Sequence, residues 1–108
     1  MIRTKEGQTL HDSWVAVIAD LLVKSGFNLV FADIPGKAKP PTLYGHIPDV
    51  YALKVEDRLQ GMPTITARAV IEVETEDTYN SITTLFQHYA FRKWAADNNA
   101  FFRVITAK

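Results

Sequence analysis

The apolar residues between positions 10 and 25 recur every three or four positions, which is the spacing of one face of a helix. This stripe consists of Trp14, Ile18, Leu21 and Leu22, widened by Val15 and Val17. Thr9 or Asp12 is expected to cap the start of the helix, and Gly26 stands where the helix should end. The pattern therefore predicts a first helix over residues 10–25.

A second stretch of helical spacing fills residues 77–98. Its apolar stripe consists of Tyr79, Ile82, Phe86, Tyr89 and Ala90. Asp77 or Thr78 is the expected N-cap, because a short polar side chain there accepts a hydrogen bond from the first turn. We expect both helices to bury their stripes against a sheet.

Shorter segments between and after the two helices have the β-branched and aromatic composition of strands. They are residues 27–34, 46–55, 64–74 and 100–108, with a loop over 35–45 and a turn over 56–63. Proline and glycine mark both the loop and the turn. The order α-β-β-β-α-β predicts an α/β fold in which a mixed central sheet is flanked by helices.

Length and composition predict one compact domain over residues 1–108, because the chain has 108 residues and is 47% hydrophobic. No apolar run approaches the roughly 18 residues of a membrane span, and the first ten residues lack the apolar stretch of a signal peptide. With no cysteine there is no disulfide framework and no thiolate metal site. We expect a cytoplasmic protein without a membrane association.

Net charge is zero, which counts against tight, non-specific DNA binding by a monomer, because such binding grows with the number of phosphates that basic side chains neutralise. A local basic patch is still compatible with this total. His11, His46 and His88 share no ligand spacing, so the sequence does not predict a zinc site.

Three acidic residues stand in strand-like segments that are otherwise apolar: Asp49, Glu72 and Glu74. A hairpin whose turn is centred between Gln60 and Gly61 places Asp49 directly opposite Glu72, with Cβ atoms about 5 Å apart. Glu74 shares the face of Glu72, because side chains alternate along a strand. The sequence therefore predicts one patch of three carboxylates.

Clustered carboxylates in a sheet repel one another and lose hydration, so a positive charge must compensate them. A hard divalent cation such as Mg²⁺ with oxygen ligands does so directly. The alternative is a solvated strand end at which Glu74, Glu76 and Asp77 begin a polar loop.

The motif "IPDV…IEVE" and the order of elements resemble the PD-(D/E)xK nuclease superfamily, with its restriction-endonuclease-like core. Compact Holliday-junction resolvases and VRR-type nucleases are similar in layout. The resemblance implies that Asp49, Glu72 and the backbone carbonyl of Val73 bind Mg²⁺ or Mn²⁺. It also implies a catalytic residue at the third motif position, where the family usually has lysine and this chain has Glu74.

By this resemblance the chain is a metal-dependent nuclease that hydrolyses DNA phosphodiester bonds, with Glu74 as a metal ligand or base and structured DNA among its candidate substrates. Gln87, Arg92 and Lys93 on the second helix are candidate auxiliary residues, and a homodimer is expected because two sites would address two strands. Glu74 also suits an inactive nuclease-fold protein that binds DNA or protein. An unrelated α/β domain with a polar sheet edge is the third hypothesis.

Overall fold

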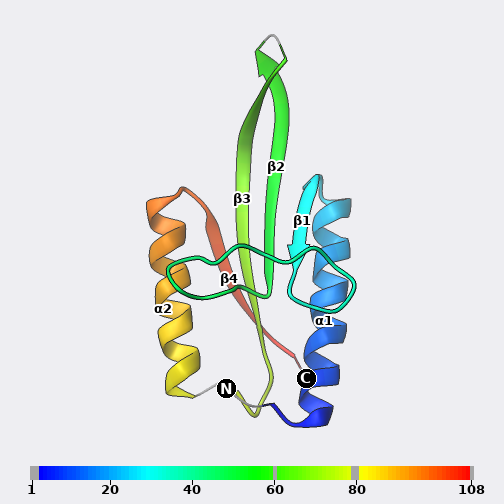
Figure 1. Cartoon of the computed structure of the whole chain (residues 1–108), viewed down its shortest axis with the longest axis vertical. Helices are drawn as coiled ribbons and strands as arrows, with labels where there is room; N and C mark the ends of the chain where they lie inside the picture. The colour runs from blue at the N-terminus through cyan, green and yellow to red at the C-terminus, as the bar shows by residue number, and fades with distance from the viewer. Residues whose placement is uncertain (1–2, 60, 79–80, 108) are drawn as a thin grey trace.

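The computed structural model describes residues 3–59, 61–78 and 81–107 of the chain. Two helices and four strands are present in the order predicted from the sequence, α-β-β-β-α-β (Figure 1). They are α1 (Lys5–Lys24), β1 (Leu29–Ala32), β2 (Val50–Leu59), β3 (Met62–Glu74), α2 (Ile82–Asp97) and β4 (Phe101–Thr106). Within the described residues, neither helix is both long enough and apolar enough to cross a membrane.

The four strands form one mixed sheet in the order β1-β2-β3-β4. β1 and β2 are antiparallel, as are β2 and β3, whereas β3 and β4 are parallel. Parallel neighbours need a crossover connection, and α2 supplies it. The predicted α/β fold with a mixed sheet and flanking helices is therefore confirmed at the level of architecture.

The register of the β2–β3 hairpin agrees with the predicted turn at Gln60 and Gly61. Val50 pairs with Ile71, and the same register continues to the pair of Lys54 with Ala67. A register shift follows between Lys54 and Val55. Extrapolated past the start of β2, this register sets Asp49 against Glu72.

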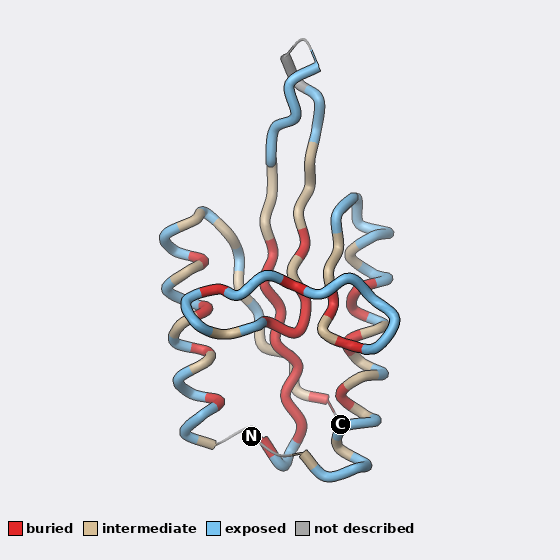
Figure 2. Tube along the Cα trace, in the orientation of Figure 1, coloured by how far each residue is buried: buried red, intermediate tan, exposed pale blue. Residues whose placement is uncertain are grey.

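Beyond that shift the hairpin leaves the body of the molecule as a projecting arm (Figure 1). The predicted turn over residues 56–63 is wrong in extent, because strand pairing continues to Leu59 and Met62. The arm is exposed along most of its length (Figure 2), and it accounts for much of the 50 Å long axis of the molecule. It has no core of its own, since no helix covers it.

Each face of the sheet carries its own apolar core. Consecutive residues of β3 alternate between the two: Ile71 packs with Val15 and Ile18 of α1, whereas Val70 packs with Phe91 of α2. α1 and α2 therefore lie on opposite faces of the sheet, because successive side chains of a strand point to opposite faces. The segment between β1 and β2 crosses in front of the sheet and reaches α2, where Leu43 joins the second core (Figure 1).

α1 begins earlier than the apolar spacing predicted, at Lys5 and not at residue 10. Its N-cap is Thr4, whose hydroxyl accepts a hydrogen bond from the Gly7 amide at 3.0 Å, so the predicted caps Thr9 and Asp12 are wrong. The first turn holds no large apolar side chain, and periodicity alone therefore missed it.

α2 differs from its prediction at its start and in its orientation. Ser81 is the N-cap, in place of Asp77 or Thr78, and accepts a hydrogen bond from the Thr84 amide. The predicted stripe faces outward: Ile82, Phe86 and Tyr89 are exposed, and Ala90 is half-buried, while Tyr79 lies outside the described residues. The buried face consists of Thr84, His88, Phe91 and Ala95.

Two phenylalanines of α2 test this orientation. Phe91 is 0% exposed and Phe86 is 67% exposed. We expect Phe91→Ala to lower the free energy of unfolding by about 3–5 kcal/mol through loss of buried contacts and a cavity. Phe86→Ala should change it by less than about 0.5 kcal/mol in dilute solution. Urea denaturation of both variants measures the difference, and equal losses would contradict the orientation.

Candidate metal centre

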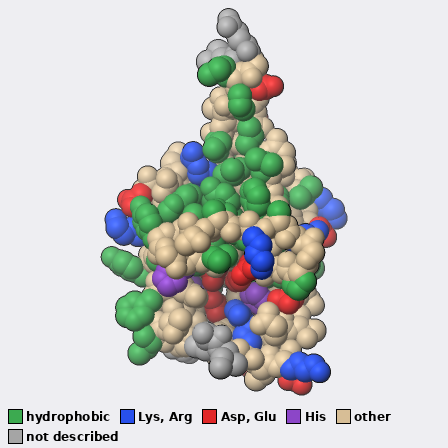
Figure 3. Space-filling view, viewed as in Figure 1, with side chains coloured by type: hydrophobic (Ala, Val, Ile, Leu, Met, Phe, Trp, Pro, Cys, Tyr) green, Lys and Arg blue, Asp and Glu red, His purple; other side chains and the backbone are tan. Residues whose placement is uncertain are grey.

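The carboxylates of Glu72 and Glu74 meet the imidazole of His88 on the face of the sheet that α2 covers. Glu72 and Glu74 are alternate residues of β3, and His88 lies on the buried side of α2. One ligand atom from each of the three lies within 4.8 Å of the other two, and all three side chains are buried. Figure 3 shows acidic, histidine and basic side chains gathered in a hollow between the helices.

Glu74 is held by hydrogen bonds on both oxygens. Its Oε1 lies 3.2 Å from His88 Nε2, and its Oε2 accepts a hydrogen bond from the hydroxyl of Thr78 at 2.7 Å. Glu74 is only 1% exposed. The residue at the third motif position is therefore a fixed part of the buried cluster and not the start of a polar loop, as the alternative interpretation required.

Asp49 and Glu72 are joined by two hydrogen bonds between side chain and backbone, which we call the clasp. Glu72 Oε1 accepts a hydrogen bond from the Asp49 amide at 2.8 Å, and Asp49 Oδ2 accepts one from the Val73 amide at 2.8 Å. Just before β2 begins, the Asp49 carboxylate therefore accepts from β3 a hydrogen bond that a backbone carbonyl of a paired strand would otherwise accept. The two side-chain hydrogen bonds extend the pairing of β2 and β3, so both acids also stabilise the sheet.

The other oxygen of Asp49 turns toward α1, away from the cluster of Glu72, Glu74 and His88. Asp49 Oδ1 lies 2.9 Å from His11 Nε2, and His11 Nδ1 lies 2.9 Å from Asp12 Oδ1. The predicted convergence of three acids is thus met in part: Glu72 joins both of the others, but the carboxylates of Asp49 and Glu74 lie on different sides of it.

His11 is buried between two carboxylates. Burial alone would lower the pKa of His11, but the hydrogen bond and the charge of Asp49, together with the hydrogen bond to Asp12, raise it above its ordinary value. Each ring nitrogen faces a carboxylate oxygen, which favours the doubly protonated imidazolium. When protonated, His11 supplies positive charge beside Asp49.

The pKa of the Glu72 carboxyl is strongly perturbed. Burial raises the pKa of Glu72 well above its usual value, and the neighbouring charge of Asp49 raises it further. The hydrogen bond from the Asp49 amide and the charge of Arg3 act in the opposite direction but do not offset this. Without an added cation, Glu72 retains its proton to a higher pH than an exposed glutamate.

Arg3 places a guanidinium at the edge of the same site. Its Nη2 donates a hydrogen bond to the Val73 carbonyl at 3.3 Å and lies 3.9 Å from Glu74 Oε2. This carbonyl is the one that the nuclease resemblance assigns to the metal. The guanidinium is incompletely satisfied, because its Nε is buried and has no hydrogen-bond partner in the described part of the chain.

The donor set fits a divalent metal ion. Two carboxylates and one imidazole converge, and the pKa of Glu72 is raised first by burial and then by the neighbouring charge of Asp49. Carboxylate oxygens suit Mg²⁺ and Mn²⁺, whereas an imidazole nitrogen is a ligand that favours transition metals. Glu72, Glu74 and His88 are therefore the residues that could hold an ion.

Within the described residues, no hydrogen bond or ion pair joins the predicted auxiliary residues to this cluster. Arg92 is exposed over the ring of Phe102, and Lys93 pairs with Asp97 at 3.3 Å. Gln87 is half-buried and makes no hydrogen bond with a described residue. Neither Arg92 nor Lys93 replaces the missing lysine in this arrangement; Arg3 is the cation beside Glu74.

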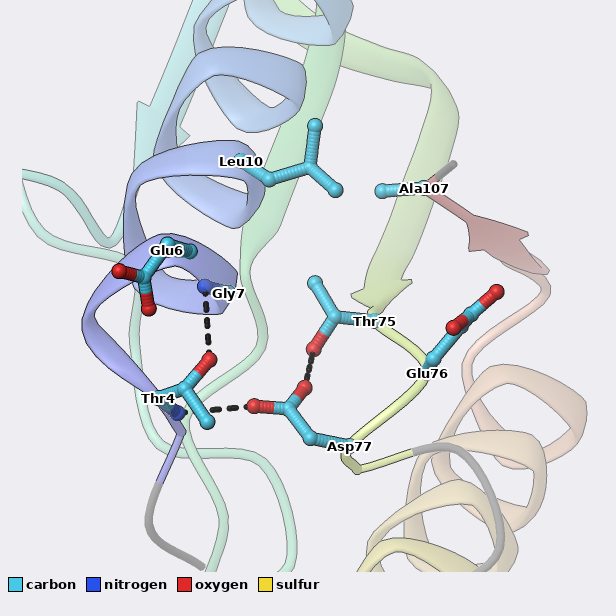
Figure 4. Close-up of a pocket in the computed structure, with 8 residues that line it drawn as sticks. All are labelled: Thr4, Glu6, Gly7, Leu10, Thr75, Glu76, Asp77 and Ala107. Atoms are coloured by element: carbon cyan, nitrogen blue, oxygen red, sulfur yellow. Dashed lines mark hydrogen bonds between the residues drawn. The ribbon is translucent and has the colours of Figure 1, made fainter.

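A separate hollow of about 410 Å³ lies beside the start of α1 (Figure 4). Thr4, Glu6, Thr75, Glu76 and Asp77 contribute its polar lining. Asp77 accepts hydrogen bonds from the Thr75 hydroxyl and the Thr4 amide, which hold the pKa of this carboxyl below its usual value. The Asp77 carboxylate ties the N-cap of α1 to the segment after β3, and the hollow does not include the metal-ligand cluster.

Three site residues were missed by sequence analysis, namely Arg3, His11 and His88. For His88 a signal existed, because it lies in helical register with Thr84, Phe91 and Ala95 on the buried face. For Arg3 and His11 the contacts join positions 70 and 38 residues apart, which no local spacing reveals.

Searches of protein-family models, of curated proteins and of solved structures found no match to this chain. The resemblance to PD-(D/E)xK nucleases therefore rests on the motif residues and on the order of the elements.

Glu72→Gln should make the metal-free protein less sensitive to pH. The pKa of Glu72 in the folded state is raised above the ordinary 4.5. The contribution of Glu72 to the free energy of unfolding is therefore fully present below that pH, and it is lost as the pH rises through the folded-state pKa. The variant cannot ionise, and its advantage in free energy of unfolding over the wild type should grow from pH 4 to pH 8. Denaturation in EDTA measures this.

Glu76→Gln is the matched control, because Glu76 is an exposed acid two positions along from Glu74. Its difference from the wild type should be small and independent of pH. A wild-type advantage at pH 8 over Glu72→Gln would contradict the assigned protonation.

Proposed function

We propose that the chain is a metal-dependent phosphodiesterase that acts on DNA through the site of Glu72, Glu74 and His88, with Asp49 and His11 beside it. The observation that carries this proposal is the convergence of buried carboxylates on one imidazole. Burial of these acids is costly unless a cation binds, so a purely structural role leaves their placement unexplained.

His88 modifies the expected choice of metal. Mg²⁺ prefers oxygen ligands in a strict octahedron, whereas Mn²⁺ accepts an imidazole nitrogen with carboxylates. We therefore expect Mn²⁺ to bind more tightly than Mg²⁺ at this site. Binding requires deprotonated Glu72, so the affinity should rise with pH.

Bound in this cluster, a divalent ion would polarise a phosphoryl oxygen and lower the pKa of a coordinated water. Among the chain's own groups, Glu74 is placed to accept the proton of that water, because its Oε1 lies inside the cluster, 3.2 Å from His88 Nε2. Arg3 offers a positive charge next to Glu74 for a substrate phosphate. Asp49 orients Val73 and β3 through the backbone.

The same arrangement supports a second function. Arg3 already donates a hydrogen bond to the Val73 carbonyl, so part of the charge is compensated without metal. A chain in which Arg3 and His11 permanently neutralise the acids would be an inactive nuclease-fold protein that binds DNA or another protein. A cytoplasmic location, expected from the sequence, suits both functions.

Cleavage assays with the full chain test the first function. Labelled linear duplex, single-stranded and four-way-junction DNA should be cut in Mn²⁺, more slowly in Mg²⁺, and not in EDTA. Glu72→Gln should lower the rate by at least about a hundredfold, which is the scale expected when a metal ligand is lost. Glu76→Gln should retain wild-type activity, because that side chain lies outside the cluster.

Calorimetric titration with Mn²⁺ separates the two functions. Tight binding without cleavage of any of these substrates would contradict the phosphodiesterase but keep the metal site. The absence of both binding and cleavage would favour the inactive module.

Arg3→Gln should tighten Mn²⁺ binding, because removal of a guanidinium beside Glu74 removes a positive charge that opposes the ion. Arg103→Gln is the matched control: Arg103 is an exposed arginine of β4 that lies over Phe101, so its loss should leave the affinity unchanged. Weaker Mn²⁺ binding by Arg3→Gln than by the control would contradict competition between guanidinium and metal.

A further inference from the structure

The turn that follows β3 carries a threonine whose hydroxyl is directed at one oxygen of Glu74. Thr78 is 1% exposed, and its Oγ1 lies 2.7 Å from Glu74 Oε2. The same Oγ1 accepts a hydrogen bond from the Thr75 amide at 3.2 Å. The other acceptors within reach of its proton are two oxygens of Thr75, both farther away at 3.3 Å. Because a hydroxyl has one proton and a carboxylate is the stronger acceptor, Thr78 donates to Glu74.

The turn itself is fastened by further hydrogen bonds, which hold the Thr78 hydroxyl in place. The Thr78 amide donates to the Thr75 carbonyl at 3.0 Å. The Thr75 hydroxyl donates to Asp77, and Asp77 accepts a hydrogen bond from the Thr4 amide at 2.8 Å (Figure 4). Thr75 and Thr78 are both buried. The donor that faces Glu74 is therefore preorganised by packing and by its own hydrogen-bond partners.

The two oxygens of Glu74 thus have different surroundings. Oε2 faces two donors, the Thr78 hydroxyl at 2.7 Å and Arg3 Nη2 at 3.9 Å. Oε1 lies 3.2 Å from His88 Nε2, inside the metal-ligand cluster. Donors present positive charge to Oε2, and that charge repels a cation. The oxygen of Glu74 that suits a metal ion is therefore Oε1.

We propose that Thr78 is a positioning residue that makes Glu74 a metal ligand through one oxygen only and thereby selects Mn²⁺ or Mg²⁺ over Ca²⁺. This inference rests on the proposed function, because it concerns the ion of the same cluster. Ca²⁺ takes roughly six to eight oxygen ligands and often binds both oxygens of one carboxylate, whereas the smaller Mg²⁺ demands an octahedron. A carboxylate whose second oxygen is held by a hydroxyl disfavours Ca²⁺. The imidazole of His88 acts in the same direction, since Ca²⁺ prefers oxygen ligands.

A purely structural role for Thr78 makes a different prediction. Loss of the hydroxyl would then loosen the turn and weaken the site for every cation alike. A positioning role instead changes the ratio of the affinities for two cations, because a released Oε2 allows Glu74 to bind an ion through both oxygens.

Calorimetric titration of the full chain with MnCl₂ and with CaCl₂ tests the proposal. Thr78→Val replaces the hydroxyl with a methyl group of similar size. We expect this variant to bind Mn²⁺ about 10–100-fold more weakly, the scale for loss of a residue that orients a metal ligand. Ca²⁺ should bind more tightly to Thr78→Val than to the wild type, so the ratio of the two affinities should fall. Thr78→Ser keeps the hydroxyl and should keep the wild-type ratio.

Thr75→Val is the matched control, because Thr75 is a buried threonine of the same turn whose hydroxyl donates to Asp77 and not to Glu74. This control should leave the ratio of the two affinities unchanged. Thr78→Ala, titrated in parallel, removes the hydroxyl with a smaller side chain, so the test does not depend on the folding of one variant. Circular dichroism of each variant checks that it is folded.

The outcomes separate this inference from the proposed function. Mn²⁺ binding by the wild type, with the same ratio in Thr78→Val and Thr78→Ala, would overturn the role of Thr78 and leave the metal site standing. An equal change of the ratio in Thr75→Val would assign the effect to the whole turn and overturn it as well. No Mn²⁺ binding by the wild type would overturn the proposed function and this inference with it.

Discussion

The clasp between Asp49 and Glu72 is the interaction on which the rest of this structure depends. Two acids hold the base of the central hairpin together: Glu72 accepts a hydrogen bond from the Asp49 amide, and Asp49 accepts one from the Val73 amide, at 2.8 Å in each case. This fixes where β2 begins and keeps both carboxylates buried. The hydrogen bonds stabilise the ionised forms, but the mutual repulsion of the charges and the loss of hydration act against them. Every polar contact around the clasp can be understood as a response to this conflict.

The response comes from three directions. α1 supplies His11 to Asp49, α2 supplies His88 to Glu74, and the segment before α1 supplies Arg3 to the Val73 carbonyl. These three cations or potential cations lie where a divalent ion would compensate the same charge. The buried negative charge is the physical reason for proposing a metal ion at this site. Burial, more than the neighbouring charge of Asp49, raises the pKa of Glu72, and a bound cation would favour its ionised form.

Particular residues show which features of the fold and the site the sequence could predict. The predicted centre of the hairpin gave the register at its base, and therefore the meeting of Asp49 and Glu72, although two register shifts lie between that base and the far end of the hairpin. The order of elements followed from periodicity, which is a local property of the chain. The partners Arg3, His11 and His88 depend on how the helices dock, which local patterns do not encode. The direction of the α2 stripe was misjudged because apolar spacing locates a helix face but does not say whether the sheet or a partner covers it.

That misjudged stripe and the metal site are two aspects of one helix. The buried face of α2 includes Thr84 and His88 as well as Phe91, so it is less apolar than the face turned to water. A helix that presents polar groups to a buried cluster gains less from burial there, so the docking of α2 on the sheet depends on Phe91 and on the contact of His88 with Glu74.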